Sequence, residues 1–532
     1  MKRLYSLLFI GFIFTDLQAQ SSTYAEDIAP IIYKNCSVCH RAGEIGPMSL
    51  TNYEEVKAWA PTIKYVTSLG FMPPWQADPE YNHFLGELIL TDEEIAQIAD
   101  WADNGTPRGD ESLEPDFPDF PDESLLGEPD LVLEMTQAHT HLGNNRDSYM
   151  YFVLPTGLTE DKFVKAVEFR AGNTKIVHHA LIFEDTEGIA AATDAMTPGY
   201  GFESFGGFGG VDDDFGVLNQ KQYPGYTPGQ KPLFYPEGIG QTLAAGSDIV
   251  VQIHYAPITD AQTDLSKVNI FFADEEEEVD RIVEDRIMLP FDIVPGGFFA
   301  FQMPPNSIKT FEGRWTVQED LSFLGLFPHM HLLGIDWEVF VEHPDGSVTN
   351  LIRIPDWDFN WQGSYYFERF YKIEKGSVIK AFATYDNTAE NPNQPNDPPK
   401  FVSWGEGTND EMYYLPLYFV PYQEGDENIV FSDGSTTSTE DITSDDNNFI
   451  YSISPNPVQG MVNVKFNMDT GGPVNIDIHS IDGKRIKSLR KGTFYNTGAH
   501  IVHFQSEQLD AGVYFIKIEG KDFSLTQKFI KS

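Results

Sequence analysis

Hydrophobic and polar positions change their period along the chain, and this change divides it into segments. Between residues 25 and 105 apolar residues recur at helical spacing, first over 25–35 and again over 52–69. The Thr-Asp-Glu-Glu sequence at 91–94 is a capping box that opens a third helix. From about 130 to 422 short strand-like runs alternate with Gly, Pro, Asn and Asp. The pattern predicts a small helical domain followed by a large antiparallel β body.

Composition marks the boundaries between these segments. Residues 1–20 carry Lys2 and Arg3 before an apolar run that is too short to span a bilayer, which is typical of a secretory signal peptide. Acidic or polar linkers flank the β body. The predicted organisation is multidomain: a signal peptide (1–20), a small all-α haem domain (21–106), a linker (107–129), two all-β domains (130–290 and 291–425), a linker (426–449) and a C-terminal β-sandwich (450–532).

The charge of the chain excludes two classes of partner. Its 532 residues include 81 Asp and Glu but only 35 Lys and Arg, which gives a formal net charge of −46. A polyanion of this kind is repelled by nucleic acid and by anionic membranes, so neither is expected as a partner. No stretch is long and apolar enough for a transmembrane anchor.

The two cysteines of the chain fall in one motif with a histidine. Cys36, Cys39 and His40 form the Cys-x-x-Cys-His pattern, in which both thiols bond the haem vinyl groups and the imidazole binds the iron. A local disulfide or a redox dithiol at the two cysteines is the alternative. The motif predicts one covalent haem c, and it leaves no cysteine elsewhere for disulfides.

A second axial ligand of the haem should lie downstream of the motif. Met72, in a Met-Pro-Pro-Trp sequence after the second predicted helix, is the preferred candidate, and Met48 and His83 are the others. The segment over 29–75 resembles the c-type cytochrome domains found fused to bacterial oxidoreductases. That resemblance implies that Met72 is the ligand.

Five histidines of the β body fall in three short settings. His178 and His179 are adjacent, His254 ends a strand-like run, and His329 and His331 are two residues apart. On a strand, residues two apart point to the same face, so the last pair is arranged as a chelate. Neutral imidazole suits copper, zinc, iron and nickel. Spacing by itself leaves a metal site and a chance grouping equally open.

Four segments around these histidines resemble a known set of ligand motifs. The segments 176–183, 250–257, 327–334 and 409–412 are similar to those of the ascorbate-dependent type II copper monooxygenases. That family includes the peptidylglycine α-hydroxylating and dopamine β-monooxygenases. The resemblance covers about residues 130–425 and implies two jelly-roll-like domains, each with one copper, across an open cleft.

The resemblance implies two coppers with different ligands. Three histidines would hold the copper that stores and passes an electron: His178, His179 and His254. Two histidines and a thioether would hold the copper at which dioxygen binds and the substrate C–H bond is attacked: His329, His331 and Met412. Gln252 matches a polar residue beside the first copper. His139 and His141 lie outside the motifs and are expected to be structural or surface groups.

Substrate recognition departs from the pattern of that family. Phe327 stands where the peptide-hydroxylating members have an arginine that anchors a carboxylate, and Pro416 stands at the offset of a tyrosine of theirs. A peptide C-terminus is therefore not expected as the substrate.

Together these features predict a secreted dicopper monooxygenase. It would hydroxylate a C–H bond of a small molecule with dioxygen and receive electrons through haem c, from an ascorbate-like reductant or a redox protein. One alternative is a non-enzymatic copper-binding or electron-transfer protein with the same ligands. Another is a zinc-dependent hydrolase, for which no carboxylate base beside the imidazoles is evident.

The last segment of the chain predicts a separate β-sandwich. Alternating runs over 462–466 and 474–478 and the Leu-Asp-Ala-Gly-Val-Tyr-Phe sequence at 509–515 are typical of short strands and turns. These motifs are similar to the type A C-terminal sorting domain of the type IX secretion system, over residues 450–532. The resemblance implies export across the outer membrane by that machinery and an extracellular or cell-surface location.

Overall fold

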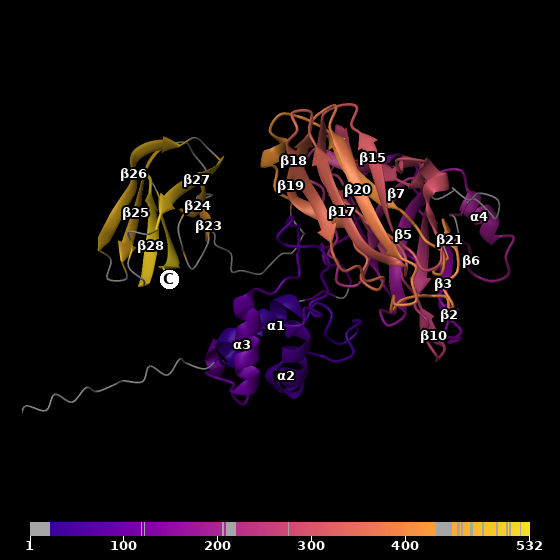
Figure 1. Cartoon of the computed structure of the whole chain (residues 1–532), viewed down its shortest axis with the longest axis horizontal. Helices are drawn as coiled ribbons and strands as arrows, with labels where there is room; N and C mark the ends of the chain where they lie inside the picture. Colours follow the sequence, from indigo (N-terminus) through magenta and orange to yellow (C-terminus); the bar gives the residue numbers. More distant parts are fainter. Residues whose placement is uncertain are drawn as a thin grey trace, which may run out of the picture. The chain divides into compact units, whose positions relative to one another are not determined.

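The computed structural model separates the chain into two compact units, Met1–Thr436 and Thr437–Ser532 (Figure 1). It describes residues 22–531 with these exceptions: 119, 122, 205–206, 209–219, 275, 406, 432–448, 455–457, 459–460, 469–471, 481–483, 496–497, 507–508, 510–511 and 522. The signal peptide predicted over 1–20 and most of the linker predicted over 426–449 lie outside the described residues.

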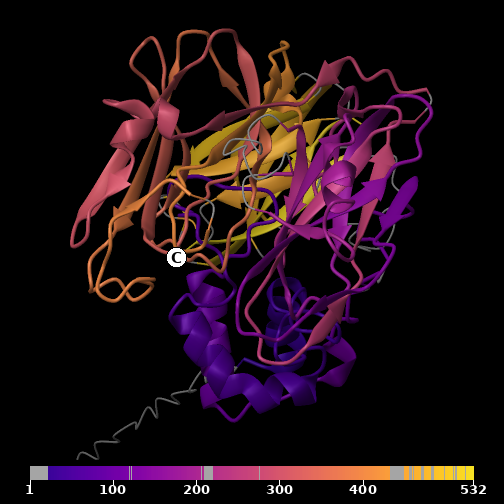
Figure 2. The same ribbon diagram turned by 90° about the vertical axis from the view of Figure 1, so that its right-hand side faces the viewer.

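The first unit begins with short helices, which form one small cluster in both views (Figures 1 and 2). They are η1 (Tyr24–Ile28), α1 (Ala29–Asn35), α2 (Tyr53–Ser68), α3 (Asp92–Asp103) and η2 (Glu111–Leu113). Asn52 caps α2, and Thr91 forms the predicted capping box of α3 with Glu94. Their apolar faces meet around Ile32 and Trp101, which are fully buried.

Two five-stranded sheets follow and share one apolar core, because alternate residues of their strands face inward. The first sheet has the order β1-β11-β4-β8-β12, with strands Leu131–Glu134, Lys267–Phe272, Lys162–Arg170, Ile239–Leu243 and Arg281–Ile282. The second has the order β6-β3-β9-β5-β7, with strands Phe202–Glu203, Ser148–Pro155, Asp248–Tyr255, Val177–Asp185 and Gln222–Tyr226. The short strands β2 (His139–His141) and β10 (Gln262–Asp264) pair with each other, and α4 spans Ile189–Asp194. We call this body the first sandwich.

A second pair of sheets forms a second sandwich with its own core. One sheet has the order β13-β22-β16-β19, with strands Glu284–Met288, Leu415–Pro421, Leu321–Leu326 and Tyr365–Ile373. The other has the order β15-β20-β17-β18, with strands Ile308–Thr316, Val378–Asp386, Gly334–Glu342 and Val348–Ile354. The remaining elements are β14 (Gln302–Met303), β21 (Val402–Ser403), η4 (Pro290–Asp292), η5 (Gly297–Ala300) and η6 (Asp426–Asn428). Trp337, Phe323 and Phe367 are fully buried between the sheets.

The prediction of a separate all-α cytochrome c domain over residues 21–106 is wrong. The described chain is mostly β, its helices are few and short, and the helical segment belongs to the same compact unit as both sandwiches. The reason lies in three apolar residues between α2 and α3, Trp75, Ala77 and Phe84, because these pack against the second sandwich rather than against the helices. Phe84 is buried in the core of that sandwich, with its ring centroid 5.3 Å from that of Phe367, and the Trp75 centroid lies 5.3 Å from that of Tyr365.

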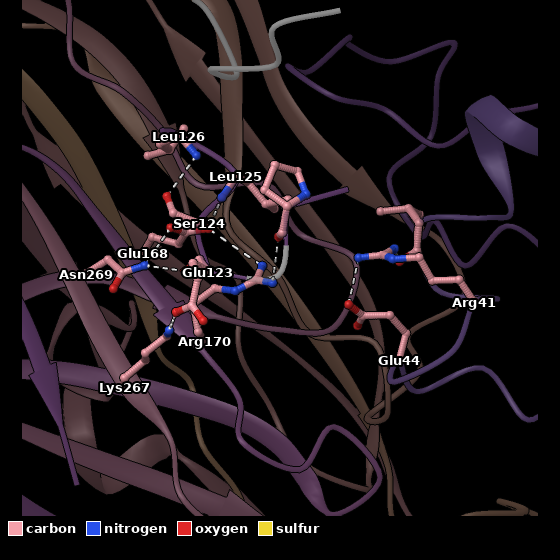
Figure 3. Close-up of polar contacts among 12 residues, drawn as sticks. Arg41, Glu44, Glu123, Ser124, Leu125, Leu126, Glu168, Arg170, Lys267 and Asn269 are labelled. Carbon is pink, nitrogen blue, oxygen red and sulfur yellow. Dashed lines mark hydrogen bonds and ion pairs between the residues drawn. The ribbon is translucent and has the colours of Figure 1, made fainter. Parts of the chain in front are cut away.

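The acidic segment after the helices is held against the first sandwich (Figure 3). The Leu125 N–H donates to Glu168 of β4 at 2.7 Å, and the Asn269 side chain of β11 donates to the Glu123 carbonyl at 2.9 Å. Lys267 forms an ion pair with the Glu123 carboxylate. These contacts fix residues 123–125 to two neighbouring strands, and the chain enters β1 from there.

The second unit has two sheets around a core of its own. One has the order β23-β24-β27, with strands Phe449–Ser454, Met461–Met468 and Gly498–Gln505. The other has the order β26-β25-β28-β29, with strands Arg485–Tyr495, Gly472–Ser480, Gly512–Glu519 and Ser524–Lys531. In the described part of the chain, no helix has both the length and the apolar character needed to cross a bilayer.

Candidate metal centre

The first sandwich brings three of the predicted ligands together on β5 and β9. In the register of these strands His179 lies opposite His254, and the register shifts between Val177 and His179. Such a bulge reorients one side chain, so the two adjacent histidines turn toward the same place. The ligand nitrogens of His178, His179 and His254 all lie within 4.8 Å of one another. We call these three residues the three-histidine cluster.

Two neighbours orient the ring of His254. Asp147, just before β3, accepts from His254 Nε2 at 2.6 Å, and the Tyr149 ring stacks on the imidazole with centroids 4.2 Å apart. Burial would raise the pKa of Asp147, but the hydrogen bond and charge of His254 bring that pKa below its usual value. With Nε2 engaged, Nδ1 of His254 is buried without a hydrogen-bond partner among the described residues. This nitrogen is the one left for a metal ion.

Burial keeps the other two imidazoles of this cluster neutral. It lowers the pKa of His178 to about 4, assisted by the nearby His254, while the backbone of Asn360 acts in the opposite direction. It lowers the pKa of His179 well below its usual value. Metal ligation needs the unprotonated imidazole, so these shifts prepare both side chains to bind a cation at neutral pH.

The second sandwich brings His329, His331 and Met412 to one pocket. The two histidines lie between β16 and β17, and Met412 precedes β22 by three residues. His329 pairs with Tyr414: the His329 N–H donates to the Tyr414 carbonyl at 2.9 Å, and the His329 carbonyl accepts from the Tyr414 N–H at 3.3 Å. This short bridge carries Met412 beside residues some eighty positions earlier. We call His329, His331 and Met412 the two-histidine cluster.

Glu411 ties the two segments of this cluster to each other. Its carboxylate accepts from the N–H groups of His331 at 2.9 Å, Leu333 at 2.6 Å and Met412 at 3.2 Å. The side chain is fully buried, which raises its pKa to about 8. Burial also lowers the pKa of His329 to about 3 and that of His331 to about 4. The chain therefore holds the two imidazoles neutral and fixes the turn that carries them.

One aromatic pocket connects the two clusters. Besides His179, His329, His331 and Met412 it is lined by Tyr149, Leu181, Gln252, Phe327, Phe359 and Tyr414. The Phe359 ring contacts both clusters, with its centroid 6.1 Å from that of His178 and 5.8 Å from that of His331. None of these lining side chains is a carboxylate, a lysine or an arginine. The pocket suits an apolar, uncharged molecule.

The Cys-x-x-Cys-His motif lies directly after α1. Cys36 and Cys39 are free thiols, and burial raises the pKa of Cys36 to about 12 and that of Cys39 to about 11. Nδ1 of His40 lies 3.2 Å from the Met48 carbonyl oxygen. A hydrogen bond of this kind orients an imidazole and leaves Nε2 for a metal.

The other predicted haem residues are further from the motif in the chain. Met72 is half-buried on the loop after α2, and its N–H lies 3.4 Å from the Val66 carbonyl. Met48 contacts the motif through its backbone carbonyl. His83 is exposed and pairs with Glu87 at 2.8 Å, so it is a surface histidine.

The pair His139 and His141 stays outside both clusters. The His139 ring stacks on Tyr255 with centroids 4.9 Å apart. His141 is buried and accepts from the Gly143 N–H at 3.2 Å, with its other ring nitrogen 3.2 Å from the Arg146 carbonyl. Both have structural roles.

Sequence reasoning missed Asp147, Glu411 and Phe359. Asp147 lies on no motif, and only the pairing of β3 with β9, which sets Tyr149 opposite His254, brings it to the site. Glu411 is adjacent to Met412, so its position in the chain was available as a signal. Nothing in the local sequence around Phe359 points to the histidines.

The donor sets of both clusters fit copper. Three neutral imidazoles suit a copper ion in either oxidation state, and two imidazoles with a thioether favour the cuprous ion. The orphaned nitrogens support this reading, because Nδ1 of His254 and Nδ1 of His329 are both buried without a hydrogen-bond partner among the described residues. An uncompensated buried polar atom is costly, and a bound metal would satisfy each of them.

Comparison with known proteins identifies the second unit. Residues 452–532 match the family described as the secretion system C-terminal sorting domain. The second unit is a type IX secretion sorting domain, and it indicates export across the outer membrane to an extracellular or cell-surface location, as predicted. No copper monooxygenase or cytochrome family matches the first unit. Among curated proteins no relative matches the sequence.

Solved structures give only a weak likeness. A β-glucuronidase of Faecalibacterium prausnitzii is 10% identical with a TM-score of 0.13, over 49% of this chain and 47% of that one. The enzyme of Dictyoglomus thermophilum is 9% identical with a TM-score of 0.13, over 46% and 43%. Bacteroides uniformis β-glucuronidase 3 is 12% identical with a TM-score of 0.12, over 42% and 26%. The chain spans less than half of each, and the likeness carries no conclusion about activity.

Proposed function

We propose that this secreted protein is a copper-dependent monooxygenase that hydroxylates a C–H bond of a small, apolar molecule with dioxygen. One observation carries the proposal: two sets of imidazoles from different sandwiches, one of them with Met412, flank a single aromatic pocket. The overall reaction takes two electrons, two protons and one dioxygen, and one oxygen atom enters the product while the other leaves as water. An ascorbate-like reductant or a redox protein would supply the electrons.

Copper bound at the two clusters would supply the single-electron steps and the activation of dioxygen. The chain's own residues position those ligands. Asp147 orients the His254 ring, the Asp410 carbonyl lies 3.1 Å from Nδ1 of His331, and Glu411 fixes the turn at His331 through the backbone. The first two partners orient the imidazoles that they contact, so little reorganisation of these rings is needed when the metal changes its charge.

The pocket selects the substrate by its apolar lining. Phe327 and Tyr414 lie on one side of it, and Phe359 lies where both clusters meet. Because no cationic side chain lines the pocket, a carboxylate-bearing substrate has no partner there. The aromatic walls also exclude water from the reacting atoms, which favours attack on the bound molecule over side reactions.

We also propose one covalent haem c at Cys36 and Cys39, with His40 and Met72 as axial ligands. The free thiols and the orientation of His40 by the Met48 carbonyl support the attachment site. Haem bound there would carry electrons to the histidine clusters.

Metal analysis of the purified mature protein tests the proposal. We expect two coppers and one iron per chain, with one copper lost in His178→Ala and one lost in His329→Ala, while His141→Ala keeps both. Zinc at the clusters in place of copper would support a hydrolase instead. If the protein binds copper but shows no oxygen uptake coupled to formation of a hydroxylated product, it is a copper-binding or electron-transfer protein and not a monooxygenase.

A further inference from the structure

The loop between β18 and β19 contacts both histidine clusters. Its Phe359 ring has its centroid 6.1 Å from that of His178 and 5.8 Å from that of His331. Residues 357–364 have no regular secondary structure, so the loop has no strand ladder to fix its conformation. One backbone bond anchors its start, from the Trp357 N–H to the Ile335 carbonyl at 3.1 Å, and the residues around Phe359 depend on bonds from side chains to the backbone.

Gln76, 282 positions before Asp358 in the sequence, supplies such bonds. Its Oε1 accepts from the Asp358 N–H at 2.7 Å, and its Nε2 donates to the Asp358 carbonyl at 3.0 Å and to the Trp361 carbonyl. One amide thus uses its acceptor and both of its donors on the backbone around Phe359. These bonds hold the peptide groups both before and after the ring that separates the clusters.

The segment that carries Gln76 is itself fixed to the second sandwich. Trp75 packs against Tyr365 at the end of the loop, and the Leu85 N–H donates to the Tyr366 carbonyl at 2.7 Å. Asn82, further along, donates to the carbonyls of Asn350 at 2.9 Å and Leu351 at 3.1 Å on β18. The segment that carries Gln76 is therefore fixed, in part by contacts with β18 that do not involve the loop.

We propose that Gln76 is a positioning residue that holds Phe359 between the two histidine clusters, so that the segment after α2 builds part of the metal centre. The metal-related consequence rests on the proposed function, whereas the fixing of the loop does not. Loss of Gln76 would release the loop, let the Phe359 ring leave its place and change the surroundings of His178.

Hydrogen exchange of the full-length chain, before and after treatment with a chelator, tests the positioning. Gln76→Ala should raise exchange in residues 357–362 by about tenfold or more, because it removes bonds that close the loop. Gln76→Glu keeps the acceptor for the Asp358 N–H but lacks the two N–H donors to the Asp358 and Trp361 carbonyls, so it should raise exchange in residues 357–362 by less than the alanine variant. The control Asn82→Ala removes the two bonds to β18 carbonyls and should raise exchange in residues 348–354 instead.

Two results would overturn the proposal. Unchanged exchange of residues 357–362 in Gln76→Ala would show that the amide bonds do not hold the loop. Equal increases over 357–362 and 348–354 in Gln76→Ala would show that Gln76 only docks its segment. If no variant and no wild-type chain binds copper, the proposed function fails while the exchange data still decide the role of Gln76.

A second readout follows the metal directly. In protein loaded with Cu²⁺, the electron paramagnetic resonance spectrum should change in Gln76→Ala and stay as in wild type in Asn82→Ala. An unchanged spectrum together with a released loop would overturn the claim that this segment builds the metal centre.

Discussion

At the scale of single residues, Asp147 shows how the site depends on groups that bind no metal. Its carboxylate fixes His254 through Nε2 and leaves Nδ1 as the free nitrogen. We expect Asp147→Ala to weaken copper binding at the three-histidine cluster by about 10–100-fold, because the ring then loses its orientation and its basicity. Asp147→Asn keeps a hydrogen-bond acceptor and should lose less.

A competition titration with a copper chelator measures this effect. Asp161→Asn is the matched control, since Asp161 accepts a bond from the Ala245 N–H at the far end of the same sandwich. Equal affinities of wild type and Asp147→Ala would contradict the assigned role.

Glu411 acts at the same scale on the other cluster. Its three N–H partners belong to His331, Leu333 and Met412, so its loss frees the turn and the thioether at once. We expect Glu411→Ala to lower the free energy of unfolding by about 2–4 kcal/mol, since three buried donors lose their acceptor. X-ray absorption of the copper-loaded variant should show a weaker Cu–S contribution. An undiminished sulfur signal would show that Met412 does not depend on Glu411.

At the scale of elements, the sequence predicted the capping box at Thr91 and the grouping of the histidines into three settings. It could not predict the bulge in β5, because a register shift is set by the pairing partner and not by the strand itself. The haem domain predicted over 21–106 also included Trp75 and Phe84, which pack in the second sandwich. An apolar residue after a helix has no local signal for which core it joins, and here that core belongs to strands more than 200 residues later.

A buried ion pair joins elements of the two sandwiches. Arg281 of β12 pairs with Asp426 of η6, with Nη1 at 2.7 Å from one carboxylate oxygen, and both side chains are buried. Ser322 of β16 also donates to Asp426. Removing one partner leaves a buried charge, so Asp426→Asn should cost about 3–5 kcal/mol of stability.

The same pair sets part of the response to acid. Burial would raise the pKa of Asp426, but the bonds from Arg281 and Ser322 hold that pKa below its usual value of 3.8. A depressed carboxyl pKa gives stability that is present above the unfolded-state pKa and is lost as the pH falls through the folded-state value. The free energy of unfolding of the wild type, measured with urea, should therefore fall below about pH 4. Asp426→Asn should lose less stability over this pH range. The same decrease in both proteins would contradict a role of Asp426 in the response to acid.

At the scale of the whole molecule, the sorting-domain match and the predicted metal and haem ligands lie in different units. All ten predicted ligands and haem residues lie in the first unit, and the second unit has its own buried core and the sorting-domain match. A chain that ends at residue 436 should therefore stay in the periplasm and still bind metal as the full-length protein does. Fractionation followed by metal analysis checks both halves of this expectation. Arrival of the shortened chain outside the cell would show that the sorting signal lies elsewhere, and loss of its metal would show that the first unit needs the second in order to fold.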